Sequence, residues 1–398
     1  MITKNHDSIK SERKIQEPSE YKTALVLALS ATHFIHDIYS SFLAPLLPLL
    51  IKKLSMSLAA AGFLSTVMQV PALMNPYIGT LADRTSVREF IVLAPALTAV
   101  TMSLIGMAPN YGVLLLLLLV AGISVSLFHV PAPVMIARLS GPTKGKGMSF
   151  FMTGGELARA LGPLAAVGAV SLFGLEGFYP VMIVGLGASA WLHLKFRDIP
   201  IMVDVAARSS IRKTWREMRF VLLPLSAILA ARGFMYASMT AFLPTFMKAQ
   251  TGDLWLGGIS LTLFEFSGVI GVLTAGSISD HFGRRKVLFV SLVGAPLSLF
   301  LFAALGGWMR YVALLFTGFT ILSTTPVMLA LVQEHAKGSP SAANGLFMMV
   351  SFIARSAIVV LVGVLGDHLG LRATYFISSF LGLLGIPFAL MLPEKRKA

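Results

Sequence analysis

Cysteine is absent from this 398-residue chain, and charged residues are scarce. The lack of cysteine excludes a disulfide framework and a thiolate metal site. Charged residues make up 13% of the chain, about half the share found in soluble domains, whereas 56% of the residues are hydrophobic. Apolar runs of about 20 residues recur along the whole length and are continuous rather than alternating. This pattern predicts membrane-spanning helices and not the strands of a barrel.

Twelve of these runs are long enough to cross a bilayer. The polar segment before the first run is expected to be a cytoplasmic tail. No signal-peptide cleavage pattern is present, so the first run should remain as a helix. We expect the spans at residues 23–51, 58–81, 90–108, 112–137, 148–171, 178–196, 218–247, 257–279, 287–306, 311–333, 343–366 and 373–392.

Acidic residues are fewer than basic ones, 18 against 32, and the basic residues are unevenly placed. With the N-terminus inside, 24 lysines and arginines fall in inside segments and 5 in outside loops. The positive-inside rule then predicts both termini in the cytoplasm, in a multi-pass protein of the inner (plasma) membrane. The positive charge is therefore an orientation signal, and no nucleic-acid partner is expected.

A basic loop at the centre of the chain divides the spans into six and six. The motif "GTLADRTSVR" (79–88) follows the second span, and "GSISDHFGRR" (276–285) follows the eighth. Two such halves predict a duplicated bundle with a substrate site between them near the membrane midplane. The predicted parts are a tail (1–22), a bundle (23–196), a linker (197–217), a second bundle (218–392) and a C-terminal tail (393–398).

The repeated motif resembles the loop signature of the major facilitator superfamily, Gly-x-x-x-Asp-Arg/Lys-x-Gly-Arg-Arg. The resemblance implies an all-α membrane protein with two pseudo-symmetric six-helix bundles, whose signature loops act as gating latches. The alternative is that the loop charges only mark topology. The matching residues are Gly79, Asp83, Arg84 and Arg88 in the first copy, with Ser86 in place of a glycine, and Gly276, Asp280, Gly283, Arg284 and Arg285 in the second.

The stretch "FHVPAPVMIARLSGPTKGKGMSFFMTGGELARALGPL" (128–164) is similar to the fosmidomycin-resistance branch of that superfamily. The branch has His-Pro on the fourth helix and Ala-Leu-Gly-Pro on the fifth. Here Val130 separates His129 from the proline, Glu156 stands where the branch has asparagine, and Arg159 adds a charge. The resemblance implies an efflux antiporter that confers drug resistance, and these departures leave its substrate open.

Three acids and three arginines lie within the predicted spans, where each unpaired arginine costs about 2.5–3.5 kcal/mol. They therefore need partners, water or substrate. They fall in spans 1, 5, 7, 8 and 11, whereas spans 3, 6, 9 and 12, which the family resemblance makes lipid-facing, have no charged residue in their interiors. The six residues are Asp37, Glu156, Glu265, Arg159, Arg232 and Arg355.

The arginines suggest an anionic substrate, because a planar guanidinium suits carboxylate, phosphate and phosphonate. Arg159 and Arg355 lie at near-equivalent depths of matching helices, and Arg232 lies near the middle of its span. Glu156 stands three residues before Arg159, so a structural pair and a direct transport role both remain open. His129 completes the predicted substrate-binding set, with capping of a kinked helix as its alternative.

Two acidic positions are candidates for a coupling proton. Asp37 has His33 one turn away and His36 adjacent, and histidine titrates near neutral pH. Glu265 is the second candidate. A satisfied hydrogen-bond network is the alternative for the Asp37 group. His129, His33 and Asp37 are conceivable metal ligands, but they lack a helical spacing such as His-x-x-x-His. No metal ion is therefore expected, and no other cofactor is implied.

No Gly-x-x-x-x-Gly-Lys-Ser/Thr pattern is present, so a proton gradient rather than ATP is the expected energy source. We predict a monomeric secondary active transporter that exports a small organic, anionic solute by proton-coupled alternating access. Proton-coupled uptake of an organic anion and lipid translocation are the alternatives. A membrane enzyme or a non-transporting receptor is the rival class, and the sequence contains no nucleophile–base constellation that supports an enzyme.

Overall fold

The chain is described by a computed structural model over residues 21–75, 78, 87–197, 211–336 and 340–392. All regular elements within these ranges are helices, which confirms the predicted all-α class. Ten helical segments are long and apolar enough to cross a bilayer, and Leu58–Met74 is a shorter apolar helix.

The first half of the chain supplies six membrane segments, several of them built from two successive helices. They are α1 (Thr23–Ser40) with α2 (Leu43–Leu54), α3 (Leu58–Gln69) with η1 (Val70–Met74), α5 (Val87–Leu104) with η2 (Ile105–Met107), α6 (Tyr111–His129) with α7 (Ala132–Leu139), α8 (Lys144–Phe173), and η3 (Tyr179–Val181) with α9 (Met182–Phe196).

The second half supplies six more segments, most of them single long helices. They are α10 (Ile211–Thr251), α11 (Leu254–Phe282), α12 (Arg284–Ala304), α13 (Gly307–His335), α14 (Pro340–Leu369), and α15 (Leu371–Leu383) with α16 (Gly385–Met391). Helix α10 begins inside the predicted linker 197–217, so the seventh segment extends further toward the N-terminus than its apolar run.

Two of the breaks in the first half follow from proline. A proline ring clashes with the carbonyl four residues earlier and supplies no N–H to bond with it. Pro45 therefore breaks the helix near Ser41, between α1 and α2. Pro133 does the same for the carbonyl of His129, which is the last residue of α6. The second break leaves the His129 imidazole at a helix end in the interior of the bundle.

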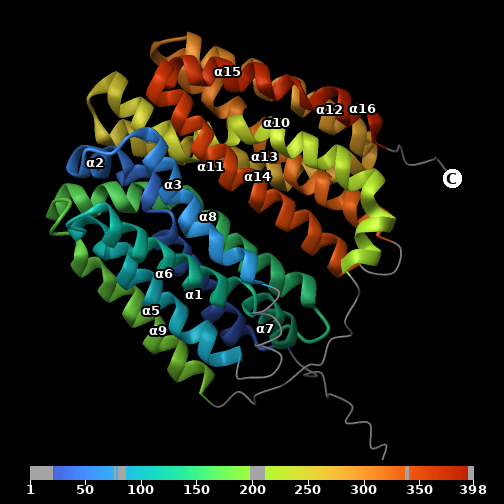
Figure 1. Ribbon diagram of the computed structural model, residues 1–398. Coiled ribbons are helices and arrows are strands. Elements are labelled where there is room, and N and C mark those ends of the chain that lie inside the picture. Colours follow the sequence, from blue (N-terminus) through green and yellow to red (C-terminus); the bar gives the residue numbers. More distant parts are fainter. Residues whose placement is uncertain (1–20, 76–77, 79–86, 198–210, 337–339, 393–398) are drawn as a thin grey trace, which may run out of the picture.

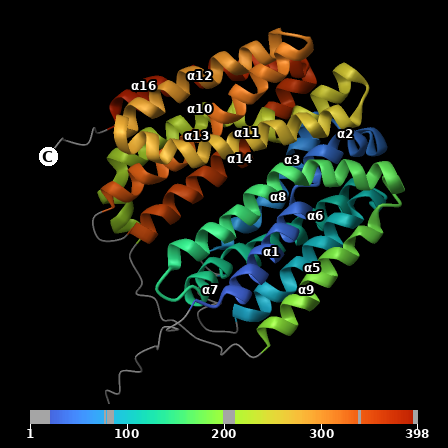
Figure 2. The ribbon, with the colours of Figure 1, turned by 180° about the vertical axis from the view of Figure 1, so that it is seen from behind.

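The two halves form separate bundles that meet at one end of the molecule (Figure 1). They touch where α2 and the beginning of α3 lie, and they diverge toward the end where α9 leaves for the linker. The reverse view shows the same V-shaped arrangement, with α8 and α11 facing one another across the junction (Figure 2). The described chain begins and ends at the divergent side.

The contact between α3 and α14 illustrates how the joined end is closed. Gly62 allows close approach, because a Cβ atom there would lie 2.6 Å from the carbonyl oxygen of Val359. Thr66 Oγ1 donates a hydrogen bond to the carbonyl of Ser356 at 2.7 Å. Helices α8 and α11 and helices α2 and α10 add further contacts between the halves. The structure is thus closed at the end away from the termini.

Candidate functional site

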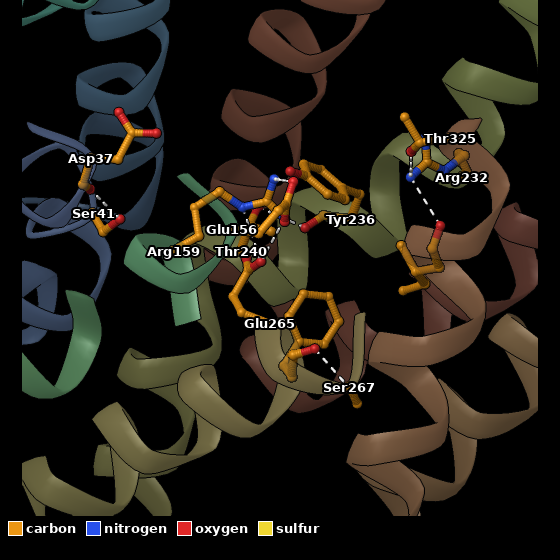
Figure 3. Close-up of polar contacts among 12 residues, drawn as sticks. Asp37, Ser41, Glu156, Arg159, Arg232, Tyr236, Thr240, Glu265, Ser267 and Thr325 are labelled. Atoms are coloured by element: carbon orange, nitrogen blue, oxygen red, sulfur yellow. Dashed lines mark hydrogen bonds and ion pairs between the residues drawn. The ribbon is translucent and has the colours of Figure 1, made fainter. Parts of the chain in front are cut away.

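Arg159 lies on α8 and joins the two halves through an ion pair. Its Nη2 atom is 3.0 Å from Oε2 of Glu265, which belongs to α11 in the second half. The same Nη2 atom is 3.3 Å from Oε2 of Glu156, one helical turn earlier on α8 (Figure 3). The side chain of Glu265 is 10% exposed and that of Arg159 is 36% exposed. Two carboxylates thus share one guanidinium, and loss of either negative charge would release part of this bridge.

Arg232 and Arg355 lie against the ring of a single tyrosine, Tyr236. The guanidinium carbons of Arg232 and Arg355 are 5.4 Å and 5.2 Å from the ring centroid, within the range of cation–π attraction. Arg232 donates from Nη2 to the carbonyl of Ile321 at 3.1 Å, which holds it against α13 (Figure 3). Within the described part of the chain, neither arginine forms an ion pair with a carboxylate.

The charges of this region are therefore separated. Arg159 with Glu156 and Glu265 has one more carboxylate than guanidinium, whereas Arg232 and Arg355 bring two positive charges with no acid beside them. In Figure 3 the ring of Tyr236 lies beside Glu156 and Arg159, on the side toward Arg232. An anion placed near Arg232 and Arg355 would gain the charge partner that the described protein residues do not supply.

Asp37 forms a third polar group, inside the first half. Its Oδ2 atom is 3.2 Å from Nε2 of His33, one turn earlier on α1. Its Oδ1 atom is 3.0 Å from Nε2 of His129, at the end of α6. His33 Nδ1 lies 2.8 Å from the carbonyl oxygen of Phe151 on α8, so one nitrogen of this imidazole contacts α8 and the other points toward Asp37. The role of Asp37 and His33 in proton coupling stays a prediction.

His36, the other histidine predicted for proton coupling, is fully buried, and its ring centroid lies 5.7 Å from that of His129. Its ring stacks on that of Phe128 with centroids 4.5 Å apart, and neither ring nitrogen has a hydrogen-bond partner. His129 ends α6 at the helix break, and its ring contacts Asp37. Its part in binding substrate stays a prediction.

The structure groups the six buried charges in a way that the sequence did not specify. The pair of Glu156 and Arg159, one of two open alternatives, is present. Glu265 joins that pair from the opposite half. Sequence reasoning missed Tyr236, although it follows Arg232 by four residues and therefore lies on the same helix face. The convergence of all three arginines on one anion stays a prediction.

The second copy of the loop motif lies at the junction of α11 and α12. Gly283 separates the two helices at a φ of +95°, a conformation that favours glycine. Arg284 forms ion pairs with Asp280 and, at 3.2 Å, with Glu334 of α13, and it donates to the carbonyl of Gly276 at 3.2 Å. These contacts join helices of one half, and Arg285 follows in the first turn of α12.

In the first copy of the loop motif, Arg88 is the one matching residue that lies within the described part of the chain. It pairs with the adjacent Glu89 at 2.7 Å and donates to the carbonyl of Arg197 at 2.6 Å, beside the beginning of the linker. Gly79, Asp83 and Arg84 lie outside the described residues. The gating role of both loops stays a prediction.

Comparisons with known proteins agree with this architecture. The sequence matches the family described as Major Facilitator Superfamily over residues 29–359 and 255–398. The fosmidomycin resistance protein of Escherichia coli (strain K12) is 26% identical over 384 residues, which cover 93% of this chain and 92% of that protein. The uncharacterized MFS-type transporter YfnC of Bacillus subtilis (strain 168) is 25% identical over 409 residues, with 97% of each chain covered.

Solved structures support the fold independently. The crystal structure of the nucleoside transporter NupG superimposes with a TM-score of 0.76 at 16% identity, covering 93% of this chain and all of that one. A sequence identity this low supports a shared fold and does not indicate a shared substrate. The matched sequence, the duplicated six-helix bundles and the membrane-spanning segments together show that this multi-pass membrane protein belongs to the Major Facilitator Superfamily, a family of secondary transporters rather than enzymes.

Proposed function

We propose that the protein is a proton-coupled exporter of a small organic anion, working by alternating access between its two halves. The observation that carries this proposal is the charge separation about Tyr236. Two guanidiniums without a carboxylate partner in the described chain lie beside a group with one carboxylate in excess. The first group suits an anionic solute, and the second suits a proton.

Coupling follows from the position of Glu265. A proton on this carboxylate removes its charge and weakens the 3.0 Å ion pair by which α11 holds Arg159 on α8. Helices α8 and α11 belong to different halves, so protonation of Glu265 weakens a contact between the halves. Such contacts have to change when the halves move relative to one another. Arg159 is then available to an anion held near Arg355.

Export is the proposed direction because of the relative from Escherichia coli, whose name describes resistance to fosmidomycin. A membrane transporter confers resistance to a compound if it carries that compound out of the cell. In that setting the protein lies in the inner (plasma) membrane as a monomer, with both termini in the cytoplasm. The divergent end of the bundles, where the described chain begins and ends, then faces the cytoplasm.

The proposal is tested in proteoliposomes loaded with a pH-sensitive dye. Fosmidomycin is the first solute to try, followed by a panel of carboxylates and phosphonates. We expect solute to leave a compartment as protons enter it, and we expect Arg355→Ala and Glu265→Gln to abolish this exchange. Arg372→Ala is the matched control, because Arg372 only donates to the carbonyls of Ala303 and Ala304 at a helix junction.

Two results would contradict the proposal. Accumulation of the solute on the side to which protons flow would establish symport instead of export. Equal exchange by Arg355→Ala and the Arg372→Ala control would remove the arginines from the solute site.

A further inference from the structure

Three side chains of the first half bring metal-binding atoms to one point, although none was expected from the spacing within a helix. His33 and Asp37 lie one turn apart on α1, and His129 reaches them from the end of α6. Two imidazole nitrogens and a carboxylate oxygen, one ligand atom from each residue, all lie within 4.8 Å of one another. Sequence spacing did not reveal this group because its third member comes from another helix.

The hydrogen atoms on His33 make this arrangement incomplete. Its Nδ1 atom is 2.8 Å from the Phe151 carbonyl, which can only accept, so Nδ1 carries the hydrogen. In the neutral ring, Nε2 then presents a lone pair toward Oδ2 of Asp37, which is also an acceptor. His33 is 3% exposed, and among the described residues no donor supplies a hydrogen bond to its Nε2 atom. A cation between these two atoms, either a proton or a metal ion, completes the contact.

The distances suit a metal ion as well as a proton. Tetrahedral Zn²⁺ binds nitrogen and oxygen at about 2.0–2.1 Å, which places neighbouring ligand atoms roughly 3.3–3.4 Å apart. His33 Nε2 is 3.2 Å from Oδ2 of Asp37, and His129 Nε2 is 3.0 Å from Oδ1, so each imidazole is near that spacing from one oxygen of the carboxylate. One ligand atom from each of the three residues lies within 4.8 Å of the other two. The hydrogen bond from His33 Nδ1 to a backbone carbonyl is the outer contact that orients metal-binding histidines in proteins.

The group is closely packed on the side of α8 and partly exposed on the side of His129. Gly155 on α8 lies beside the group, where a Cβ atom would come within 2.6 Å of His33 Cε1 and 3.3 Å of Asp37 Oδ2. The ring of Phe151 stacks on His33 at 4.0 Å and excludes competing polar groups from that side. The side chain of His129 is 36% exposed, so the site is reached from its side.

We propose that His33, Asp37 and His129 bind one divalent transition-metal ion of the Zn²⁺ class. Two imidazoles and a carboxylate, without thiolate, suit Zn²⁺, Co²⁺ or Ni²⁺, whereas Ca²⁺ and Mg²⁺ prefer oxygen ligands throughout. The three protein ligands leave a fourth position for water or another small ligand. The ion would link α1 to α6 within the first half. Its binding does not depend on which solute is transported.

The test is a titration of the purified, chelator-treated full-length protein with Co²⁺, whose visible absorption reports the number and geometry of its ligands. We expect one equivalent to bind with the spectrum of a four-coordinate ion, Zn²⁺ to displace it, and Mg²⁺ to leave it unchanged. His129→Gln, at a partly exposed position, should weaken Co²⁺ binding by about 100-fold or more. His193→Gln, which removes an exposed histidine on α9, is the matched control and should bind like the parent.

Zinc-edge X-ray absorption on the parent protein provides a second measurement that does not depend on any variant. Two imidazole nitrogens and an oxygen at about 2.0–2.1 Å are expected in the first shell of the ion. Absence of Co²⁺ binding, equal binding by His129→Gln and the control, or a first shell without imidazole would overturn the proposal and leave a shared proton as the cation at this site.

Discussion

Replacing Asp367 with asparagine should loosen the contact that closes the joined end of the two halves. Asp367 lies near the end of α14, and its Oδ1 and Oδ2 atoms accept hydrogen bonds from the backbone amides of Leu58 at 2.6 Å and Ala59 at 2.9 Å. These are the first amides of α3, which have no partner within their own helix. A carboxylate of the second half thus caps a helix of the first half, where the helix dipole also favours negative charge.

The size of the effect follows from these two hydrogen bonds. A hydrogen bond to a charged group contributes about 1.5–3 kcal/mol when buried, and we take about 1 kcal/mol for each because Asp367 is exposed. Asparagine keeps one acceptor oxygen and loses the charge, so the substitution should cost about 1–2 kcal/mol. Because 1.36 kcal/mol corresponds to a factor of ten, opening of this end should become roughly 5- to 30-fold more frequent.

The absence of cysteine makes this opening measurable with a single introduced thiol. Val362 of α14 is fully buried in a cluster that also contains Leu46 and Leu50 of α2, so Val362→Cys reports separation of the halves. When reclosing is faster than the reaction, the rate of maleimide labelling follows the open fraction. Asp367→Asn should raise that rate by the factor given above.

Asp253→Asn is the matched control for this experiment. Asp253 also caps a helix, accepting from the amide of Trp255 at 2.8 Å, but this contact lies within the second half. Asp253→Asn should therefore leave the maleimide labelling rate of the Val362→Cys protein unchanged. If the two asparagine variants label at the same rate, Asp367 does not hold the halves together, and the reasoning from the cross-half cap is refuted.

Three further predictions concern single positions. Glu265→Gln keeps the shape of the side chain but removes its charge. Proton-driven exchange should therefore be lost, while solute binding, measured by thermal shift, should persist. Unchanged proton-driven exchange would refute the role of the ion pair between Glu265 and Arg159. Gly318→Ala places a Cβ atom against the carbonyl of Phe264 and should destabilise the packing of α11 on α13 by about 1–3 kcal/mol, whereas Gly187→Ala, with open space beside it, should leave the melting temperature unchanged. Lys53 hydrogen-bonds Glu176 and lowers the pKa of that carboxyl, so the pair stabilises the fold above the ordinary glutamate pKa and loses this effect as the pH falls through the lowered value. Glu176→Gln should therefore melt slightly below the parent at neutral pH and together with it in acid, and a difference that grows toward low pH would contradict this assignment.

The membrane segments were predictable because hydrophobicity is a local property that accumulates along the chain. Each predicted span corresponds to a helical segment in the described part of the chain. The boundaries were harder to predict, since they depend on polar helix extensions and on breaks within a span. Helix α10 begins at Ile211 within the predicted linker, and Pro45 and Pro133 divide two of the predicted spans.

The candidate site was predictable as a set of residues and not as a set of contacts. A charge in an apolar run is costly wherever its partner lies, so Arg159, Glu265 and Asp37 were identifiable from sequence alone. Their partners are far away in the chain. Glu265 is 106 residues from Arg159, and His129 is 92 residues from Asp37.

By itself, the sequence determined that this protein is a duplicated bundle of membrane helices whose interior contains three acids and three arginines. Hydrophobic runs are sufficient for the membrane helices, because the bilayer acts on each helix separately, and the repeated loop motif indicates the duplication. The tertiary structure decided which charges neutralise one another, which arginines share Tyr236, and that His129 lies beside His33 and Asp37. Those outcomes depend on the packing of helices from distant parts of the chain, where a shift of one turn exchanges one set of neighbours for another.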